Sequence, residues 1–595
     1  MGGTPGRTDR GAGRRRAAGG RRRAVLGVRG PLVVSGLAAV LLVAGTTGAV
    51  GLPAAGPGAA TVAAADPVLP APPGPQLDRA KVDRALDRLD SYVDTVMKST
   101  GVPGISVAVV YRDEVVYQKG FGVREVGKSA AVDPDTVFQL ASVSKPLAST
   151  VVAGVAGEKG GPGWDTPVAE ELPGFTLKDP WVGSHVTVAD LFSHRSGLPD
   201  HAGDLLEDLG FDQQYILDHL KEEPLAPFRD SYAYTNFGLT AAAEAVARGR
   251  GTSWQALSQE VLFGPAGMED TSTEYAAFAA ATDRAVGHVK GADGAWRPGP
   301  VRDADAQAPA GGTSSTARDM ARWLRLQLAG GTLDGRRIVP EQQLLDTHRP
   351  QITSQPARNL TGRTGFYGLG WNVSYDDQAR LRLSHTGAFD LGANSNVTML
   401  PLEQLGIVVL SNGTPVGQAD AIALDFFDTA QYGKPRTDWL PVTAALYAQA
   451  EDEHPDARFD RPPASPAPAG PDTDYTGTYR SAFYGPLTVR SGPEGLTLFL
   501  GPEPMRFPLR HFDGNTFSME TRGENAVGRT AVEFGDGTVR IEYLDETGLG
   551  TFTKASSDPS AEPSGTARPT GTATGGPSGT PTGPSDSGAP SPSGE

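Results

Sequence analysis

The pattern of apolar positions predicts that the first folded segment is a helix followed by a β-hairpin. Apolar residues recur at helical spacing in this segment, at Leu77, Val82, Leu86, Leu89, Val93 and Met97. This periodicity predicts an amphipathic helix that reaches about Ser99. The β-rich runs 105–111 and 115–117 follow, with Asp113 and Glu114 in the turn between them. A helix before a hairpin indicates an antiparallel sheet that is covered by a helix.

Helical and strand-like runs continue as far as residue 432. Helices are predicted over 147–155, 187–194, 239–246, 254–262 and 419–432, and from a cap at Ser314 or Ser315 to Leu328. Strands are predicted over 367–373, 381–384, 396–400 and 406–410. Because strands lie at both ends of this region, we expect an α/β (α+β) fold over 79–432. Distant segments would form one antiparallel sheet that is flanked by helices and carries a helical subdomain.

The N-terminal 65 residues have the features of an export signal. An arginine-rich start precedes an apolar, uncharged run over 31–52, and Ala63-Ala64-Ala65 before Asp66 forms a plausible cleavage site. Arg22-Arg23 followed by apolar residues resembles a twin-arginine signal. The apolar run is also long enough to span a membrane, so an uncleaved anchor is the alternative. Either way, we expect the folded part to be secreted or extracytoplasmic.

Composition divides the rest of the chain into further segments. Linkers are expected at 66–78 and 433–474, a small antiparallel β domain at 475–554, and a disordered Ser/Thr/Pro/Gly-rich tail at 555–595. The role of the β domain is not readable from its sequence. A lid or a docking surface is the working guess.

Charge and cysteine content exclude several classes of function. Residues 1–65 hold nine arginines and one aspartate, so their removal leaves 44 basic residues against 68 acidic ones. An acidic surface of this kind disfavours nucleic acids and anionic membranes as partners. Cysteine is absent, which excludes disulfides, thiolate metal sites and cysteine catalysis.

A serine three residues before a lysine is the first candidate for chemistry. Ser142 follows the apolar run 138–140, and Lys145 lies about one turn later on the same face of a helix that begins near Ala141. The first turn of a helix favours negative charge, and a buried lysine of lowered pKa can take the proton of the serine. This is the S-x-x-K arrangement of acyl-serine enzymes. Chance alone supplies about 0.6 copies of the motif in this chain, so the motif also fits an exposed lysine.

Two more motifs follow in order, Tyr234-Thr235-Asn236 and His385-Thr386-Gly387. Together with the S-x-x-K motif they favour a catalytic role over an exposed lysine. Three supporting stretches accompany them, at 191–199, at Ala310-Gly311-Gly312 and at 367–371. At these positions the chain resembles the serine β-lactamase and penicillin-binding-protein family. The branch it resembles contains class C β-lactamases, D-Ala-D-Ala carboxypeptidases and related esterases. The resemblance covers about residues 80–432 and implies a β-lactamase-like fold.

The resemblance implies a catalytic role for three residues. Ser142 would attack a carbonyl carbon and form an acyl-enzyme. Lys145 and Tyr234 would share the proton transfer, with Lys145 holding Tyr234 partly or wholly as a phenolate. Which of the two is the base for acylation stays open.

It also implies a substrate-binding role for the residues around these three. Asn236 would bind the substrate amide and Lys145, and the backbone N–H groups of Ser142 and Ala388 would form the oxyanion hole. The third motif, His385-Thr386-Gly387, would contact the substrate, with His385 helping to bind its anionic end. Many β-lactamases have lysine where this chain has His385. A largely neutral histidine is a weaker carboxylate anchor, which disfavours efficient β-lactam hydrolysis.

We therefore expect an exported serine hydrolase that acts through an acyl-enzyme on D-amino-acid peptides, amides or esters. The alternatives are a small-ester esterase, a β-lactamase, or a catalytically silent binder of cell-wall peptides. The sequence has neither a G-x-S-x-G elbow nor metal-ligand spacing among its nine histidines, and no cofactor is expected. The expected partner is a small molecule or a cell-wall peptide. His194 lies between two serines, but we expect it to anchor a loop, because no acid has a defined place beside it.

Overall fold

The computed structural model describes residues 76–359, 362–452, 458–459, 461 and 463–555. The expected export signal, residues 66–75 of the linker after it and residues 556–595 of the expected tail lie outside the described residues. None of the described helices is both long enough and apolar enough to span a membrane.

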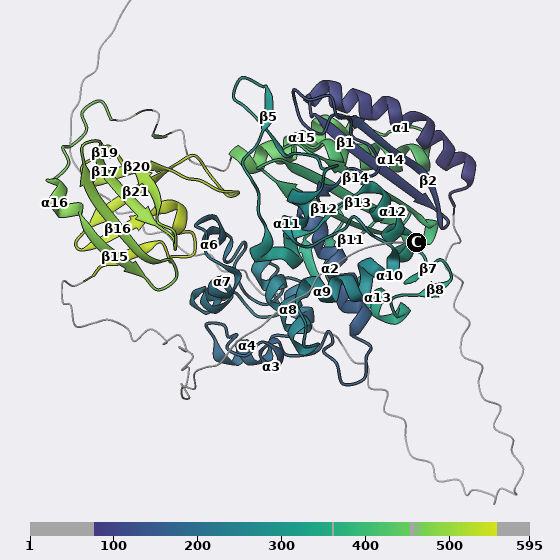
Figure 1. The fold of residues 1–595 in the computed structure, drawn as a ribbon, viewed down its shortest axis with the longest axis horizontal. Helices are drawn as coiled ribbons and strands as arrows, with labels where there is room; N and C mark the ends of the chain where they lie inside the picture. Colours follow the sequence, from purple (N-terminus) through teal and green to yellow (C-terminus); the bar gives the residue numbers. More distant parts are fainter. Residues whose placement is uncertain (1–75, 360–361, 453–457, 460, 462, 556–595) are drawn as a thin grey trace, which may run out of the picture. The chain divides into compact units, whose positions relative to one another are not determined.

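A sheet of eight antiparallel strands forms the centre of the first folded part (Figure 1). Its strands are β1 (Gly104–Tyr111), β2 (Glu114–Gly122), β9 (Ile352–Gln355), β10 (Gly365–Tyr367), β11 (Asn372–Tyr375), β12 (Leu381–Phe389), β13 (Ala393–Leu400) and β14 (Leu405–Ser411). Their order across the sheet is β2-β1-β14-β13-β12-β11-β10-β9. Ile105 of β1 pairs with Ser411 of β14. The first hairpin is therefore joined to the last strand, as the sequence predicts.

Both faces of this sheet are buried. Successive side chains of a strand point to opposite faces. In β1, Ala108 and Val110 belong to one apolar cluster, whereas Val107 and Val109 belong to a second. The alternation explains why β1 reads as a continuous apolar run although each face is packed separately.

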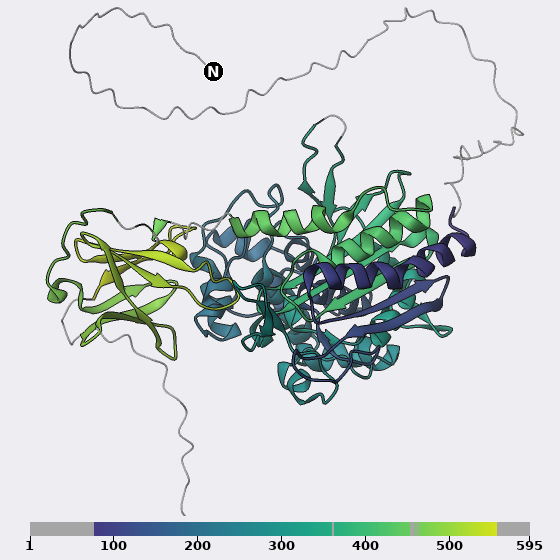
Figure 2. The same ribbon diagram turned by 90° about the horizontal axis from the view of Figure 1, so that it is seen from above.

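One face is covered by helices from the two ends of the domain. α1 (Arg79–Thr100) and α14 (Gln418–Tyr432) pack on this face, and α15 (Trp439–Asp452) packs on α14 (Figures 1 and 2). The Arg88 Nε atom donates to Asp425 Oδ2 at 2.9 Å and joins α1 to α14. The predicted first helix, hairpin and closing helix are confirmed.

The other face carries the helices that hold the candidate catalytic residues. α2 (Ser144–Val155) and α12 (Ala317–Leu328) lie against it, and the indole N–H of Trp323 donates to Thr150 Oγ1 at 3.1 Å to join them. The other helices are α3 (Val168–Glu171), α4 (Pro180–His185), α5 (Val188–Phe192), α6 (Asp204–Asp208), α7 (Gln213–His219), α8 (Asn236–Gly249), α9 (Trp254–Ser258), α10 (Gly264–Ala266), α11 (Tyr275–Ala280) and α13 (Glu341–Thr347). Three short strand pairs complete this part, β3 (Phe138–Gln139) with β6 (Ser314–Ser315), β4 (His288–Lys290) with β5 (Trp296–Pro298), and β7 (Thr332–Leu333) with β8 (Arg336–Arg337).

Three local predictions were wrong. The single strand predicted over 367–373 is two strands, β10 and β11, joined by a turn in which Gly370 adopts a left-handed φ of 79°. The cap of α12 is Thr316, whose hydroxyl accepts from the backbone of Asp319. The segment expected to be a linker over 433–474 contains α15, which was missed because its proline-rich surroundings suggested a linker.

The C-terminal part is an antiparallel β domain, as predicted. Its strands are β15 (Gly477–Ser481), β16 (Gly485–Gly492), β17 (Gly495–Leu500), β18 (Met505–Pro508), β19 (Arg510–Asp513), β20 (Thr516–Glu520), β21 (Arg529–Gly535), β22 (Thr538–Ile541) and β23 (Thr551–Lys554), preceded by α16 (Asp472–Tyr475). They form one sheet in the order β18-β17-β16-β15-β23-β22-β21-β20-β19. Alternate residues of β16, such as Leu487 and Val489, face an apolar core.

Candidate active site

The candidate nucleophile lies in a strained turn at the start of α2. Residues Ala141–Val143 form one turn of 3-10 helix, and Ser144 begins the α-helix. Ala141 has a left-handed φ of 46°, which is unfavourable for a residue with a side chain. Ala141 is fully buried, so the surrounding packing holds this conformation and leaves Ser142 half-buried.

Lys145 lies beneath this serine and is fully buried. Its Nζ atom is 3.1 Å from Ser142 Oγ and donates to Asn236 Oδ1 at 2.6 Å and to the Ala310 carbonyl at 2.9 Å. Burial lowers the pKa of Lys145 to about 7, although the Asp204 carboxylate opposes this shift. A substantial fraction of the amine is therefore neutral near pH 7, as a proton acceptor for Ser142 must be.

Tyr234 completes the group around the serine. Burial raises the pKa of Tyr234 well above its usual value, although the neighbouring Ser142 hydroxyl opposes this shift. Lys145 Nζ lies over the ring, 4.5 Å from its centroid. This geometry favours a neutral phenol beside a partly neutral amine. The expectation that Lys145 holds Tyr234 as a phenolate therefore has no support in this arrangement.

Asn236 connects Lys145 to an acidic residue that the sequence gave no reason to select. Asn236 is the first residue of α8, and its amide donates to Asp204 Oδ2 at 2.8 Å. Asp204 begins α6, is 3% exposed, and also lies 2.8 Å from His201 Nδ1. Burial alone would lower the pKa of His201, but its hydrogen bond to Asp204 raises it to about 9. No motif marks Asp204, because only the folding of α6 against α8 brings it to the site.

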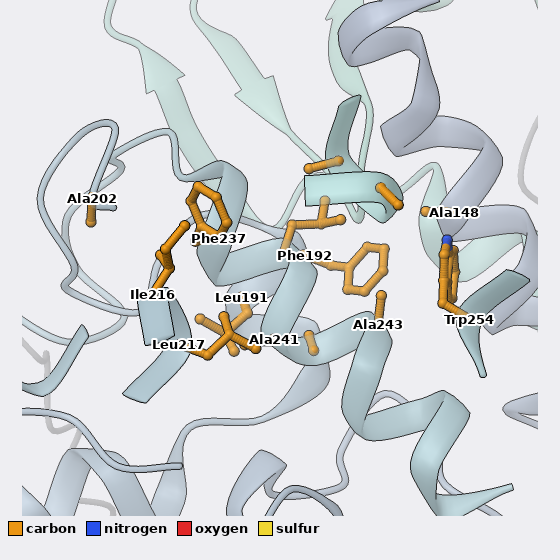
Figure 3. Close-up of a cluster of buried hydrophobic side chains, with 14 of the residues drawn as sticks. Ala148, Leu191, Phe192, Ala202, Ile216, Leu217, Phe237, Ala241, Ala243 and Trp254 are labelled. Atoms are coloured by element: carbon orange, nitrogen blue, oxygen red, sulfur yellow. The ribbon is translucent and has the colours of Figure 1, made fainter. Parts of the chain in front are cut away.

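Apolar packing fixes the helices that bear these residues. Leu191 and Phe192 of α5 lie against Ala241 and Ala243 of α8, and Ala148 of α2 belongs to the same cluster (Figure 3). The small alanines allow the helices to approach closely, so packing holds Lys145 and Asn236 at hydrogen-bonding distance.

Strand β12 forms the opposite side of the site and carries the third motif. A Cβ atom on Gly387 would lie 2.0 Å from the Leu140 carbonyl oxygen, so only glycine lets this strand pass the segment before the nucleophile. β11 pairs with β12 only as far as Ser384. Within the described residues, the rest of β12 has no strand neighbour on that edge. The backbone N–H of the exposed Ala388 therefore fits the predicted oxyanion hole together with that of Ser142.

His385 differs from its expected role in binding an anionic group. The residue is 3% exposed, and its ring nitrogens lie 2.8 Å from the Tyr367 hydroxyl and 2.9 Å from the Thr386 carbonyl. Burial, reinforced by Lys145, lowers the pKa of His385 to about 3. His385 is therefore neutral and brings no positive charge to a substrate carboxylate. It supports Tyr367 within the wall of the site.

Thr386 is fixed by a polar network that reaches the unexpected helix α15. Its hydroxyl donates to Asp420 Oδ1 at 2.6 Å, and the Asn396 amide donates to the same oxygen at 2.7 Å. The Tyr447 hydroxyl of α15 donates to Asp420 Oδ2 at 2.8 Å. Asp420 and Tyr447 were not expected at the site, because they belong to elements far from the motif in sequence.

The supporting stretches hold the catalytic group in place. The Ala310 carbonyl accepts from Lys145, and a Cβ atom on Gly370 would lie 2.8 Å from the Lys145 carbonyl oxygen. His194 is buried, and its Nδ1 atom accepts from the Thr235 backbone at 3.2 Å. His194 thus anchors the loop that carries Tyr234, which confirms the prediction for this histidine. Among the described residues, no group of three or more His, Cys, Asp or Glu is placed to hold a metal ion.

Two families match the chain. The family described as Beta-lactamase matches residues 89–428, and one described as Domain of unknown function (DUF3471) matches residues 461–549. The first match spans every residue of the candidate site. The second falls on the C-terminal β domain and on the residues before it.

Three curated relatives share most of their length with the chain. Unguisins hydrolase ungD' of Aspergillus campestris is 26% identical over 445 residues, which cover 69% of this chain and 79% of that protein. The D-alanyl-D-alanine-carboxypeptidase/endopeptidase AmpH of Escherichia coli is 23% identical, covering 56% of this chain and 85% of that protein. Penicillin-binding protein 4 of Amycolatopsis lactamdurans is 28% identical, covering 56% and 86%.

A solved structure shares the fold. The octameric penicillin-binding protein homologue from Pyrococcus abyssi superimposes with a TM-score of 0.51 at 18% identity, covering 79% of this chain and 100% of that one.

Proposed function

The chain belongs to the beta-lactamase family, and from this premise we propose that it is a serine hydrolase of D-amino-acid peptides, amides and esters. The observation that carries the proposal is the buried Lys145 amine, 3.1 Å from the Ser142 hydroxyl. A lysine with a pKa of about 7 beside a serine is suited to proton transfer and is costly to maintain for structure alone.

In the proposed reaction, neutral Lys145 takes the hydroxyl proton as Ser142 Oγ attacks the substrate carbonyl carbon. The backbone N–H groups of Ser142 and Ala388 stabilise the oxyanion that forms. Collapse of the tetrahedral intermediate breaks the bond to the leaving amine or alcohol, which receives a proton through Lys145 and the neutral phenol of Tyr234. Water then attacks the acyl-enzyme by the same route in reverse and releases the acid.

The relatives' names support peptides as substrates. One relative is named as a D-alanyl-D-alanine carboxypeptidase and endopeptidase, and another as a penicillin-binding protein. A neutral His385 weakens recognition of a terminal carboxylate, which favours amides and esters without that group. We propose an extracytoplasmic location and a small molecule or a cell-wall peptide as the partner, with the N-terminal segment as export signal or anchor.

Two covalent probes test this function on the purified full-length chain, with Ser142→Ala as control. We expect a fluorophosphonate to label the wild type and not the variant. A fluorescent penicillin then sorts the activity: stable label indicates a carboxypeptidase, and label that decays quickly indicates β-lactamase turnover. Fluorophosphonate labelling without penicillin labelling indicates an esterase or amidase. The absence of any Ser142-dependent label would reject the hydrolase and leave a silent binder of cell-wall peptides.

A further inference from the structure

The C-terminal β domain encloses a cavity next to the proposed oxyanion hole. The cavity has a volume of about 620 Å³. Ala388, His201 and Asp204 line it from the catalytic domain, and Tyr484 and Asn525 line it from the β domain. Because Ala388 and Asp204 also belong to the catalytic centre, a group of a bound substrate can extend from Ser142 into this cavity.

The loop 521–528 of the β domain is fixed to the helical wall of the cavity. Asp208, at the end of α6, accepts from the backbone N–H groups of Glu524 at 2.8 Å and Asn525 at 2.9 Å, and from the Asn525 side chain at 2.9 Å. Gly523 has a left-handed φ of 106°, and a Cβ atom there would lie 2.3 Å from Asp208 Cγ. Only glycine therefore lets the loop approach α6 this closely.

The same loop is fixed to the strand that carries the oxyanion hole. The Glu524 carboxylate accepts from the backbone N–H groups of Asp390 at 2.5 Å and Leu391 at 3.4 Å, in the turn between β12 and β13. Arg302 Nε lies 3.5 Å from Oε2 of this carboxylate, and Arg302 Nη2 lies 2.8 Å from Glu207. The β domain is thus bonded both to α6 and to the turn after β12, the strand that carries Ala388.

The lining of the cavity is rich in carboxylates. Four come from the catalytic domain and three from the β domain, namely Asp200, Asp204, Glu223, Asp390, Glu524, Glu542 and Glu546. Burial raises the pKa of Glu524 to about 8, so the negative charge near pH 7 comes mainly from the others. The basic groups along the lining are fewer and have partners of their own: His201 lies beside Asp204, and Arg529 pairs with Glu520 at 2.8 Å. Arg302 and Arg458, outside the lining, pair with Glu524 and Glu542.

A second observation is that one acid of this lining has an oxygen without a hydrogen-bond donor. Asp204 is only 3% exposed. Its Oδ2 atom has two hydrogen-bond partners, Asn236 and His201, whereas its Oδ1 atom has none among the described residues. A buried acceptor without a donor is unfavourable unless a ligand supplies one. Asp204 bonds Asn236 of the catalytic group and also lines the cavity, so this acceptor lies where the two sites meet.

We propose that this cavity is a subsite for a positively charged group of the substrate, an ammonium group attached to the acyl part, and that the β domain supplies one wall of it. The proposal rests on the proposed function, since it names the class of substrate on which Ser142 acts. It gives the β domain a role in selecting substrates that its sequence does not indicate.

A pair of substrates of equal size tests the subsite. D-alanine p-nitroanilide carries an ammonium group, and D-lactoyl p-nitroanilide carries a neutral hydroxyl at the same position. We expect kcat/KM to be about tenfold higher for the ammonium substrate at low salt, and the ratio to fall as salt screens the attraction. A ratio of one or below would overturn the subsite.

Charge reversal separates the cavity from the rest of the domain. Glu546 is exposed, lines the cavity, and lies outside the catalytic group. Glu546→Lys should lower the ratio at least about threefold while leaving kcat/KM for the neutral substrate unchanged. The matched control is Asp536→Lys, an equal charge change in the exposed hairpin between β21 and β22. It should leave the ratio unchanged, and equal effects of the two variants would mean that the cavity is not the site.

Fluorophosphonate labelling distinguishes failure of the proposed subsite from failure of the proposed hydrolase activity. If Ser142 is labelled but the neutral substrate is preferred, the subsite is rejected and the hydrolase stands. If neither substrate is turned over and Ser142 is not labelled, both proposals fall. Equal melting temperatures of the two lysine variants exclude misfolding as the cause of any difference.

Discussion

The proposed catalytic centre and the β-domain wall of the cavity are neighbours, but different features of the sequence determine them. Short motifs determine the first, and contacts between distant residues determine the second. Ser142 lies in the 3-10 turn just before α2, Lys145 lies in the first turn of α2, and Asn236 begins α8, so short motifs fix their geometry. The wall depends on Gly523, Glu524 and a few backbone contacts, with no motif that predicts it. The geometry of the proposed catalytic group thus depends on short spacings along the chain. The proposed selection of substrates depends instead on contacts between two domains.

Removal of the nucleophile should have the largest effect. Ser142→Ala should lower kcat by about 10⁴-fold or more, because Ser142 Oγ is the atom proposed to form the acyl-enzyme. Steady-state hydrolysis of D-alanine p-nitroanilide measures this. The melting temperature should stay within a few degrees of the wild type, since Ser142 is only half-buried. Activity retained in this variant would move the chemistry to another residue.

Replacement of the proposed base, Lys145, should have the second-largest effect on activity. Lys145→Arg keeps a cation but cannot accept a proton near neutral pH, and should lower kcat/KM by about 10²–10⁴-fold. In the wild type, kcat/KM should rise with pH and level off above about 7, because the amine must lose its proton to act and its pKa is about 7. A profile that rises only near the ordinary pKa of a lysine or tyrosine would contradict this role.

Loosening the contact between the loop 521–528 and α6 should weaken substrate binding and leave the rate of the chemical step nearly unchanged. Asp208→Ala removes the acceptor of three N–H groups that hold the loop 521–528. We expect KM for the ammonium substrate to rise about tenfold and kcat to change little. The rate of fluorophosphonate labelling should be unaltered. A loss of labelling would mean that the β domain supports the nucleophile itself.

A smaller effect is expected where the two regions touch, at Asp204. Asp204→Asn keeps an acceptor for Asn236 but removes the negative charge that raises the pKa of Lys145. The rising limb of the kcat/KM profile should therefore move to lower pH, by up to about one unit. A shift to higher pH, or none, would show that Asp204 does not act on the amine. Asp204→Ala, which also removes the acceptor, should lower the plateau as well.

The sequence predicted the elements and motifs that depend on neighbours along the chain. The first helix and hairpin followed from apolar periodicity, and the S-x-x-K spacing placed Ser142 and Lys145 one turn apart. The turn at Gly370 was missed because a glycine within an apolar run reads as part of a strand. Helix α15 was missed because its proline-rich surroundings read as a linker.

Residues that reach the site from far along the chain could not be predicted. Asp204 and Asp420 are unremarkable acids in sequence and gain their roles only when α6 meets α8 and α14 meets β12. The burial of His385 and its contact with Tyr367, which disfavour a charged imidazole, could not be predicted for the same reason, because they are properties of the folded state. The cavity wall lies at a meeting of two domains, which periodicity and motifs do not describe.

The most direct test of the account is mass spectrometry of the protein after acid quenching during turnover of a D-alanine ester near pH 7, where Lys145 is partly neutral and acylation can proceed. The account predicts a species heavier by one alanyl group, with the added mass on the peptide that contains Ser142, and no such species for Ser142→Ala. An acyl group on another residue, or steady turnover of the ester by the Ser142→Ala variant, would contradict it.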